Sequence, residues 1–466
     1  MWKRFPCIPI INKFLLVLLI LSGIYSPVLS AQSIHDPTHG FSKSVSRGGT
    51  SSSSNMNLTE GDMLWNQTYD YARTKDLAFS VIETADKGLA IAARVFYIDG
   101  EIWDQDGLLI KTDAVGEVQW TQSYGGNRTE YARDVIQTAD GGFAMAGSTS
   151  TNSTGRTDGW LVKTSSGGEE EWSQQYAGID FDDFNALIQT REGGYALAGQ
   201  RNFNAWIVKT DPRGKKEWAH TLGRGGFGRA QDIIQTMDRG YCVVGSCGNL
   251  LNYDLWVIKL AKNGTVEWNR TYNSIRGKTP DDHGYSVIQT ADRDFVLFGD
   301  TVNLHNETGT DFWLVKTDAA GVPLWNRTYG EEGTESLYAG IKTIDGGFAL
   351  TGYTNSFGVE RSDFYLVKTD AQGVLEWNRT YGTSYWEEAR SLVQTSDSGF
   401  VLVGMLRPPI AGSTPNTNIW FVKVKGRGVP PSSTPSFWIL FFFPTTLVLG
   451  CLVLFFSSKR KRRINE

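Results

Sequence analysis

The chain has 466 residues, of which 40% are hydrophobic, 20% charged and 12% aromatic, with 51 glycines and 16 tryptophans. This composition is typical of a folded, turn-rich protein and excludes a disordered one, and four cysteines exclude a disulfide scaffold. The formal net charge is −5, but residues 31–436 carry 37 basic against 49 acidic residues, a balance of −12. Such a surface repels phosphate backbones, so we expect no nucleic-acid partner.

The N-terminal segment has the pattern of a secretory signal. Lys3, Arg4 and Lys13 precede a short apolar run at 14–21, and small residues surround Ser30. The run is too short to span a membrane. We therefore predict a signal peptide over 1–30 with cleavage after Ser30, followed by a Ser/Gly-rich linker over 31–60.

The C-terminal segment has a different pattern. Residues 437–456 are 20 uncharged residues, followed directly by the basic stretch "SSKRKRRINE". This predicts a transmembrane helix over 437–456 with a basic cytoplasmic tail over 457–466, so that the rest of the chain is extracellular. A sorting signal that a transpeptidase removes is the alternative interpretation. In either case a Pro/Ser linker over 426–436 joins the main domain to the anchor at the cell membrane.

The middle of the chain consists of seven copies of one unit. The phrase "VIQTADGGFAMAGS" (135–148) recurs with its threonine at 84, 138, 190, 236, 290, 343 and 395, a period of 46 to 54 residues. A second phrase, such as "DGWLVKTSSGGEEEW", follows in each copy. Each unit divides into four short strands separated by tight turns, and an acid two residues after each threonine favours the first turn.

The register of the tryptophans predicts how the repeats close. A tryptophan follows nine residues after each of the first six lysines of the second phrase, but Ser432 occupies that place after Lys423. The missing strand lies at the other end, around Trp65. We therefore predict an all-β fold over 61–425, a seven-bladed β-propeller in which the N-terminal strand closes the last blade.

These phrases, "QTxDGGFxLxG" and "DxWLVKTDxxGxxxW", resemble the secreted β-propeller repeats found in many bacterial and archaeal surface proteins. The resemblance covers 61–425, and the strand donation is similar to that of WD-repeat propellers. It implies the fold and leaves the activity open, because propellers include binding modules, scaffolds and enzymes.

Acidic residues recur eight positions before the threonine in six of the seven copies, and the seventh copy has Gly228. In a ring they would surround one mouth of the axial channel, where carboxylates attract a cation such as Ca²⁺ or a basic peptide. The alternative is that each carboxylate caps the backbone of its own loop. These candidate channel-mouth residues are Asp76, Glu130, Asp182, Asp282, Glu335 and Glu387.

Aromatic residues supply a second set of candidates. Twelve of the 16 tryptophans fall at two repeat positions, which indicates packing between blades. Trp103 and Trp386 break the register and lie in predicted loops, so they are candidates for stacking on a ligand.

Two further features concern the outer strands and the cysteines. N-glycosylation acceptor motifs recur on the predicted fourth strands and nearby, and we expect glycans at Asn66, Asn127, Asn269, Asn326 and Asn378. Cys242 and Cys247 are interpreted as two buried free thiols, with a strained bridge as the alternative.

The sequence favours a cell-surface binding module whose ligand is a protein or a glycan. A polysaccharide-active hydrolase or lyase and a structural envelope protein are the alternatives. No catalytic residue is assigned, because the histidines show no metal-ligand spacing and no carboxylate pair departs from the repeat.

Overall fold

The computed structural model describes residues 42–44, 58–71, 75–99, 102–126, 129–150, 156–178, 181–223, 226–249, 252–274, 281–302, 309–357, 361–408 and 417–427. Contacts divide the chain into Met1–Gly426 and Arg427–Glu466, and the fold below is that of the first unit. The predicted signal peptide, transmembrane helix and cytoplasmic tail lie outside these residues. No helix within the described ranges has the length and apolar character that crossing a membrane requires.

The described strands form seven sheets, as the seven repeats predicted. Each repeat supplies one four-stranded antiparallel blade, and we number the blades by their threonines in chain order. From the first to the fourth strand, blades 1 to 3 are β3 (Leu77–Glu83), β4 (Leu89–Asp99), β5 (Ile102–Thr112) and β6 (Val118–Tyr124); β7 (Glu130–Gln137), β8 (Phe143–Thr149), β9 (Asp158–Thr164) and β10 (Glu170–Tyr176); and β11 (Asp182–Gln189), β12 (Tyr195–Arg201), β13 (Asn204–Thr210) and β14 (Lys216–Leu222). Blades 4 to 6 are β15 (Phe227–Gln235), β16 (Tyr241–Asn249), β17 (Asn252–Leu260) and β18 (Val266–Tyr272); β19 (His283–Gln289), β20 (Phe295–Val302), β21 (Thr310–Thr317) and β22 (Pro323–Tyr329); and β23 (Glu335–Lys342), β24 (Phe348–Thr354), β25 (Asp363–Thr369) and β26 (Leu375–Tyr381).

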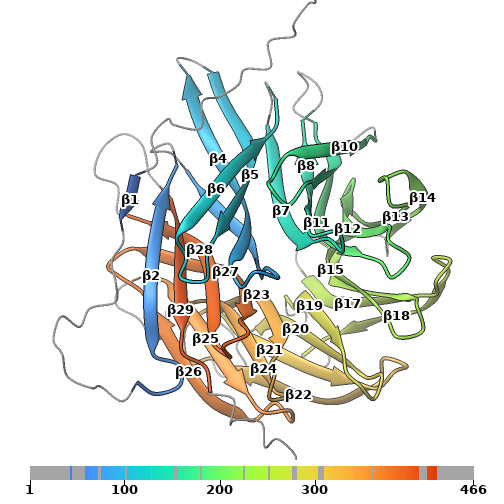
Figure 1. The fold of residues 1–466 in the computed structure, drawn as a ribbon. Coiled ribbons are helices and arrows are strands. Elements are labelled where there is room, and N and C mark those ends of the chain that lie inside the picture. The colour runs from blue at the N-terminus through green and yellow to red at the C-terminus, as the bar shows by residue number, and fades with distance from the viewer. Residues whose placement is uncertain are drawn as a thin grey trace, which may run out of the picture. The chain divides into compact units, whose positions relative to one another are not determined.

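Blade 7 joins the two ends of the domain. It contains β27 (Trp386–Gln394), β28 (Phe400–Arg407), β29 (Asn418–Val424) and, as its fourth strand, β2 (Met63–Asp70). Trp65 lies opposite Lys423 in this pairing, which confirms the predicted closure. Figure 1 shows blue β2 beside red β29. A short strand in the stretch predicted as a linker, β1 (Ser42–Ser44), pairs with β2 and adds a fifth strand.

The first strands form the inner wall of the ring. Each contacts the first strand of the next blade, and β27 contacts β3 to complete the circle. Polar side chains join some of these neighbours: Asp134 accepts a hydrogen bond from Leu187 N at 2.9 Å. Asp232 accepts one from Val287 N in the next blade, also at 2.9 Å. The ring is therefore held on its inside by bonds between blades as well as by apolar packing.

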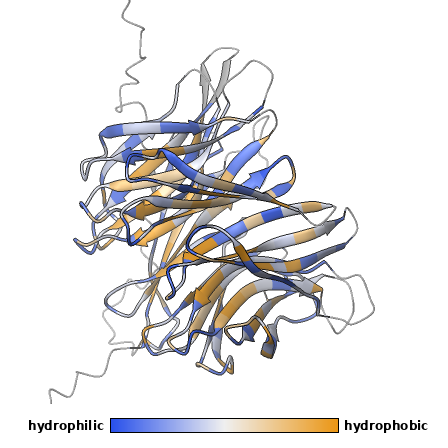
Figure 2. Ribbon diagram, turned by 90° about the vertical axis from the view of Figure 1, so that its right-hand side faces the viewer, coloured by the Kyte–Doolittle hydropathy of each residue, from blue (hydrophilic) through white to orange (hydrophobic). Residues whose placement is uncertain are grey.

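The core consists of seven apolar clusters, one at each junction between adjacent blades. The second and third strands are buried on both faces; β8, β9 and β25 are buried along their whole length. Hydrophobic residues accordingly run along the strands in Figure 2, and hydrophilic residues gather at the turns. A blade has no core of its own, so neighbouring blades must stack to remove this surface from water.

The fourth-strand tryptophans pack between blades, as their regular recurrence indicated. Each lies against the glycine of the turn that precedes the fourth strand of the next blade. A Cβ added at Gly116 would lie 2.8 Å from the Trp65 ring, and one added at Gly168 would lie 2.7 Å from the Trp120 ring. At the end of the strand a tyrosine hydroxyl bonds the same glycine, as Tyr176 does to Gly214 O at 2.6 Å.

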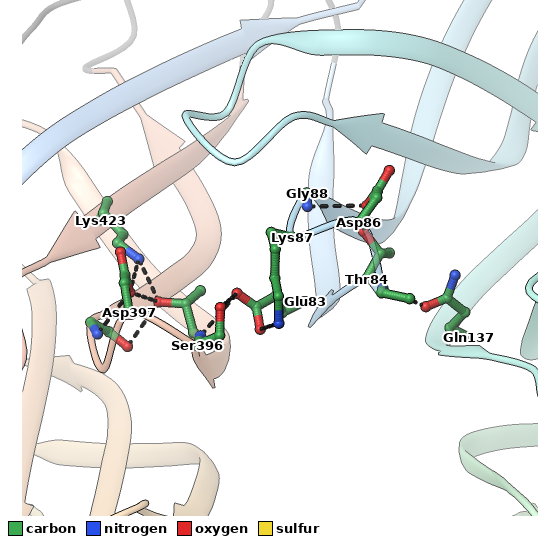
Figure 3. A network of polar contacts seen from close by, with 12 residues as sticks. Glu83, Thr84, Asp86, Lys87, Gly88, Gln137, Ser396, Asp397 and Lys423 are labelled. Atoms are coloured by element: carbon green, nitrogen blue, oxygen red, sulfur yellow. Dashed lines mark hydrogen bonds and ion pairs between the residues drawn. The ribbon is translucent and has the colours of Figure 1, made fainter. Parts of the chain in front are cut away.

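The repeated "QT" phrase also connects neighbouring blades. Gln137 accepts a hydrogen bond from Ala85 N at 2.8 Å, and Glu83, the equivalent residue of blade 1, accepts one from Ser396 N at 2.9 Å. In six of the seven blades the turn aspartate binds the lysine of the third strand, as Asp397 binds Lys423 at 2.9 Å, whereas in blade 3 Lys209 pairs with Glu217. Figure 3 shows this chain of contacts crossing the closing seam.

The two faces of the ring differ in their connections. On the turn face, every connection between first and second strands has five residues, and those between third and fourth strands of blades 1 to 6 also have five. On the loop face, where the first strands begin, connections between second and third strands range from 2 to 10 residues. The segment around Trp103, predicted as a loop, is instead an extension of the β4–β5 hairpin, paired as far as Asp99 and Ile102.

Cys242 and Cys247 are buried thiols that form no disulfide in the described structure, as favoured by the sequence. They lie on β16 and belong to the apolar clusters on its two sides. Because five residues separate them, the alternation of side chains along a strand directs them to opposite faces, which prevents a bridge.

Substitution of Gly116 tests the closing contact. Gly116 has φ +81° and is covered by Trp65, whereas Gly141 has φ +86° and open space around its Cβ position. We expect Gly141→Ala to lower the free energy of unfolding by about 1 kcal/mol through backbone strain alone. Gly116→Ala must also displace Trp65, so it should lower the melting temperature clearly further. Equal effects of the two substitutions in thermal denaturation would show that Trp65 does not support the seam.

Candidate ligand-binding site in the axial channel

A β-bulge interrupts the first strand of every blade at one position. Between the first and second strands the register shifts at the residue five positions before the repeat threonine. A bulge leaves its extra residue outside the ladder and re-aims the side chain. The seven bulged residues are Phe79, Arg133, Asn185, Gln231, Tyr285, Tyr338 and Arg390.

These seven side chains, together with Arg229, line one cavity of ≈ 280 Å³. Every blade contributes to it from its first strand, so the cavity lies on the axis of the ring. Its size is close to the lower end of the range for small-molecule sites. The lining includes three guanidinium groups, two amides and three aromatic rings, and it includes no carboxylate.

The arginines are held by neighbours that leave several of their donors available. Arg229 donates to Asn185 Oδ1 at 2.9 Å, and Arg390 forms an ion pair with Glu388. Arg133 lies over the Phe79 ring at 5.6 Å. A fourth arginine, Arg94 on β4, also contacts Phe79, at 5.7 Å. Within the described residues, Nε of each of these four arginines is buried and has no hydrogen-bond acceptor.

The two tyrosine rings of the cavity pack against each other and against an arginine. Tyr285 and Tyr338 pack edge to face with centroids 5.9 Å apart, and the Arg390 guanidinium lies 4.0 Å from the Tyr338 centroid. Asn185 donates to Ala230 O at 2.8 Å, which fixes its amide between blades 3 and 4. The site therefore combines flat apolar surface with orientated polar groups.

The charges around the cavity are predominantly positive. Burial lowers the pKa of Arg94 and Arg133, and the neighbouring arginines lower it further. Asp183, which favours the charged form of Arg133, and Glu388 are the acids that act directly on these arginines. Burial raises the pKa of Asp300, next to Tyr285, to about 7, so this carboxyl is only partly ionised at neutral pH.

The six acids predicted at the channel mouth lie at or directly before the start of the first strands, and their side chains are buried, at 0 to 5% exposure. The contacts below join these side chains to their own blade or to the loop that leads into it. Asp76 accepts from Tyr71 N at 2.6 Å, Asp282 from Ser274 N at 2.9 Å, and Glu335 from Glu331 N at 3.1 Å.

The other three members make related contacts. Glu130 accepts a hydrogen bond from Thr149 at 2.7 Å, Asp182 pairs with Arg201 at 2.8 Å, and Glu387 accepts one from Thr383. These three contacts are to side chains, whereas those of Asp76, Asp282 and Glu335 are to backbone N–H groups. Within the described part of the chain no three His, Cys, Asp or Glu residues are grouped as a metal site, and calcium binding stays a prediction.

At three junctions such an acid lies near an aspartate of the preceding blade's third strand: Glu130 near Asp106, Glu335 near Asp311, and Glu387 near Asp363. A Cβ added at Gly330 would lie 2.2 Å from Asp311 Oδ1 and 2.4 Å from Glu335 Oε2, so both carboxylates border the same glycine. The last such pair is Asp363 and Glu387. One oxygen of each carboxyl group, Oδ1 of Asp363 and Oε2 of Glu387, is buried without a hydrogen-bond partner in the described chain. Burial raises the pKa of Asp363 to about 6 and that of Glu387 to about 7, and the charge of Asp363 contributes to the shift at Glu387.

The two aromatic candidates lie in strands, so their placement in loops was wrong. Trp103 belongs to β5, opposite Ile98 in the extended hairpin, and the structure describes its backbone only. Trp386 is the first residue of β27 and is 37% exposed, with the Arg361 guanidinium 3.9 Å from its ring centroid. Both strands begin earlier than the repeat spacing indicated. The hydrogen-bonded pairing with the neighbouring strand continues beyond the segment that the repeats share.

The glycosylation candidates lie where the outer-strand pattern placed them. Asn66, Asn269, Asn326 and Asn378 are all on fourth strands, at the outer edge of their blades, and Asn269 and Asn326 are exposed. Asn127 lies outside the described residues.

Sequence analysis missed the bulged residues, although a signal was present. The positions that hold the blades together recur from copy to copy, whereas the position five residues before the threonine carries Phe, Arg, Asn, Gln and Tyr in different copies. The position seven residues before the threonine, which includes Arg229, varies as well. Variation on the inner strands of an otherwise regular repeat is typical of a binding site, because such a site requires different groups from different blades.

Comparison with known proteins assigns the chain to no family. No protein-family model matches the chain, and no curated protein matches it. Among solved structures, Sqt1 from Chaetomium thermophilum bound to the N-terminus of ribosomal protein L10 is similar at 11% identity and a TM-score of 0.44, over 75% of this chain and 89% of that one. Drosophila Plexin A in complex with Semaphorin 1b is similar at 9% identity and a TM-score of 0.45, over 78% and 87%. A puromycin hydrolase is similar at 10% identity and 0.45, over 76% and 54%.

The carboxyl pair of Asp363 and Glu387 predicts a pH dependence of stability. Their pKa values are raised in the folded state, so their contribution is fully present below the unfolded pKa of ~4 and is lost as pH rises through about 6 to 7. We expect the melting temperature to fall between pH 5 and pH 8.

Asp363→Asn should reduce that fall and raise stability at pH 8 by about 2 kcal/mol, since asparagine already occupies this repeat position at 204 and 418. The exposed Glu169→Gln is the matched control. An unchanged pH slope in Asp363→Asn would contradict the assignment.

Proposed function

We propose that the chain is a cell-surface-anchored binding module whose ligand occupies the axial cavity. One observation carries this proposal: a single cavity collects one bulged side chain from each of the seven blades. The residues that build the ring recur, and those that line the cavity differ. The side chains that reach the cavity differ in chemistry from blade to blade, as is expected where one ligand is contacted from several sides.

The two ends of the sequence support the anchoring. A signal peptide over 1–30 would export the chain, and the apolar segment 437–456 with its basic tail would retain it at the membrane with the propeller outside. Acceptor asparagines on the outer strands suit an extracellular domain, because glycans there would project away from the axis.

Binding is favoured over catalysis by the chemistry of the lining. Among the described residues that line the cavity there is no Asp, Glu, His, Ser or Cys, and a glycoside hydrolase of the usual kind needs two carboxyl groups on opposite sides of the bond. The polar groups present are guanidinium, amide and phenol groups, which recognise a ligand and hold it.

Filling the cavity tests its role. Gln231 lines the cavity and is half-buried, so Gln231→Trp should occupy the space while leaving the ring intact. We expect the full-length protein in detergent to bind members of a mixed glycan and peptide array, and the variant to lose that binding at an unchanged melting temperature. Ligands that bind both proteins equally would place the binding site elsewhere and overturn the proposal.

The mass added by N-linked glycans tests the extracellular placement of the propeller. If the chain is exported in a host that N-glycosylates, some of the exposed sites such as Asn269 and Asn326 should carry glycans. Treatment with an N-glycosidase should then lower the apparent mass, and the double substitution Asn269→Gln with Asn326→Gln should reproduce part of the change. A mature protein at its bare polypeptide mass in such a host would contradict this placement.

A further inference from the structure

We infer that the axial cavity is an anion site and that its ligand is an acidic saccharide, a sugar unit bearing a carboxylate or sulfate group. This inference rests on the proposed function, because it names the ligand class of the same cavity. It starts from a contrast in charge: residues 31–436 have a balance of −12, yet the cavity lining holds three arginines and no acid.

The arginines lie close to one another, so their positive charges repel. A bound anion would remove the free-energy cost of this repulsion. Arg133 lies within electrostatic range of Arg229 and Arg94, and Arg94 within range of Arg390. Like charges that are partly removed from water repel each other strongly, since the local dielectric is low. Asp183 and Glu388 compensate two of the four positive charges, and a bound anion would compensate the others.

The geometry leaves donors for such an anion. A guanidinium has five N–H donors in a planar fork, and the hydrogen bonds of Arg229 to Asn185 and of Arg390 to Glu388 each use one terminal nitrogen. Nε of both, and that of Arg133, is buried, so the donors that face the cavity are terminal nitrogens. Terminal nitrogens of neighbouring guanidinium groups can bind the oxygens of a carboxylate or sulfate between them.

The remaining lining favours a saccharide over an acidic peptide. The Asn185 and Gln231 amides supply donors and acceptors for hydroxyl groups, and Phe79 and Tyr285 supply apolar faces for the C–H groups of a sugar ring. A peptide would need an extended edge or groove to satisfy its backbone, whereas this cavity is compact, at ≈ 280 Å³.

Isothermal titration with short probes tests the ligand class. Trigalacturonate supplies carboxylates, a chondroitin sulfate disaccharide supplies a sulfate, maltotriose is the neutral match, and triglutamate is the acidic peptide. We expect one or both acidic saccharides to bind at least about tenfold more tightly than maltotriose and triglutamate, with affinity falling as salt rises. The two acidic arms distinguish the carboxylate source from the sulfate source.

Substitutions connect that binding to the arginines. Arg133→Gln and Arg390→Gln, made separately, should each weaken binding of the acidic probe by about ten- to a hundredfold. Arg213→Gln, at an exposed turn on the opposite face, should leave it unchanged. If one variant fails to fold, the other carries the test, and melting temperatures identify which have folded.

The failures of the two proposals are distinguishable. Binding of maltotriose as tight as that of the acidic probes, or acidic binding that survives both arginine substitutions, overturns the anion assignment. If such neutral binding is lost in Gln231→Trp, the cavity remains the site and only the ligand class is wrong. Tighter binding of triglutamate than of either saccharide would replace the saccharide by an acidic peptide.

Discussion

The pairing of β2 with β29 is the constraint on which the rest of the structure depends. These strands lie at opposite ends of the domain, and their ladder, with Trp65 opposite Lys423, converts a row of sheets into a closed ring. Closure removes two exposed sheet edges and completes the apolar junction between blades 7 and 1. Closure also creates the axis: without it the seven bulged side chains would not face one another, and the chain would have no common cavity.

The residues that hold the blades together and those proposed to bind a ligand lie on different faces of the ring and at different positions of the repeat. On the turn face, five-residue connections repeat, and in six blades the same threonine, aspartate and lysine contacts hold the turn to its own blade. On the loop face and along the bulge the blades differ. Uniform junctions make the ring rigid, and a rigid ring can hold different side chains at fixed positions around one ligand.

Charge is organised in three zones from the outside inwards. The exterior is acidic in net balance, the blade junctions hold buried carboxyl pairs such as Asp363 with Glu387, and the axis holds arginines. The Asp363–Glu387 pair tolerates burial because its raised pKa values let it keep part of its protons near neutral pH. The arginines cannot lose theirs so readily, so their repulsion is balanced only in part by Asp183 and Glu388, which is why the axis is the natural place for an anion.

The sequence by itself determined the blade count, the four strands of each blade and the seam at Trp65, because these follow from turn chemistry and from spacing along the chain. It also located the acids at the start of the first strands, but not their direction: Asp282 and Glu335 turn to their own loops, where backbone N–H groups need acceptors. Trp103 and Trp386 were assigned to loops because a repeat does not show how far a ladder extends. Only the tertiary structure decided that Arg133, Tyr285 and Arg390 share one cavity, since their meeting requires a bulge in each first strand and the closure of the ring, and neither is a property of any single repeat.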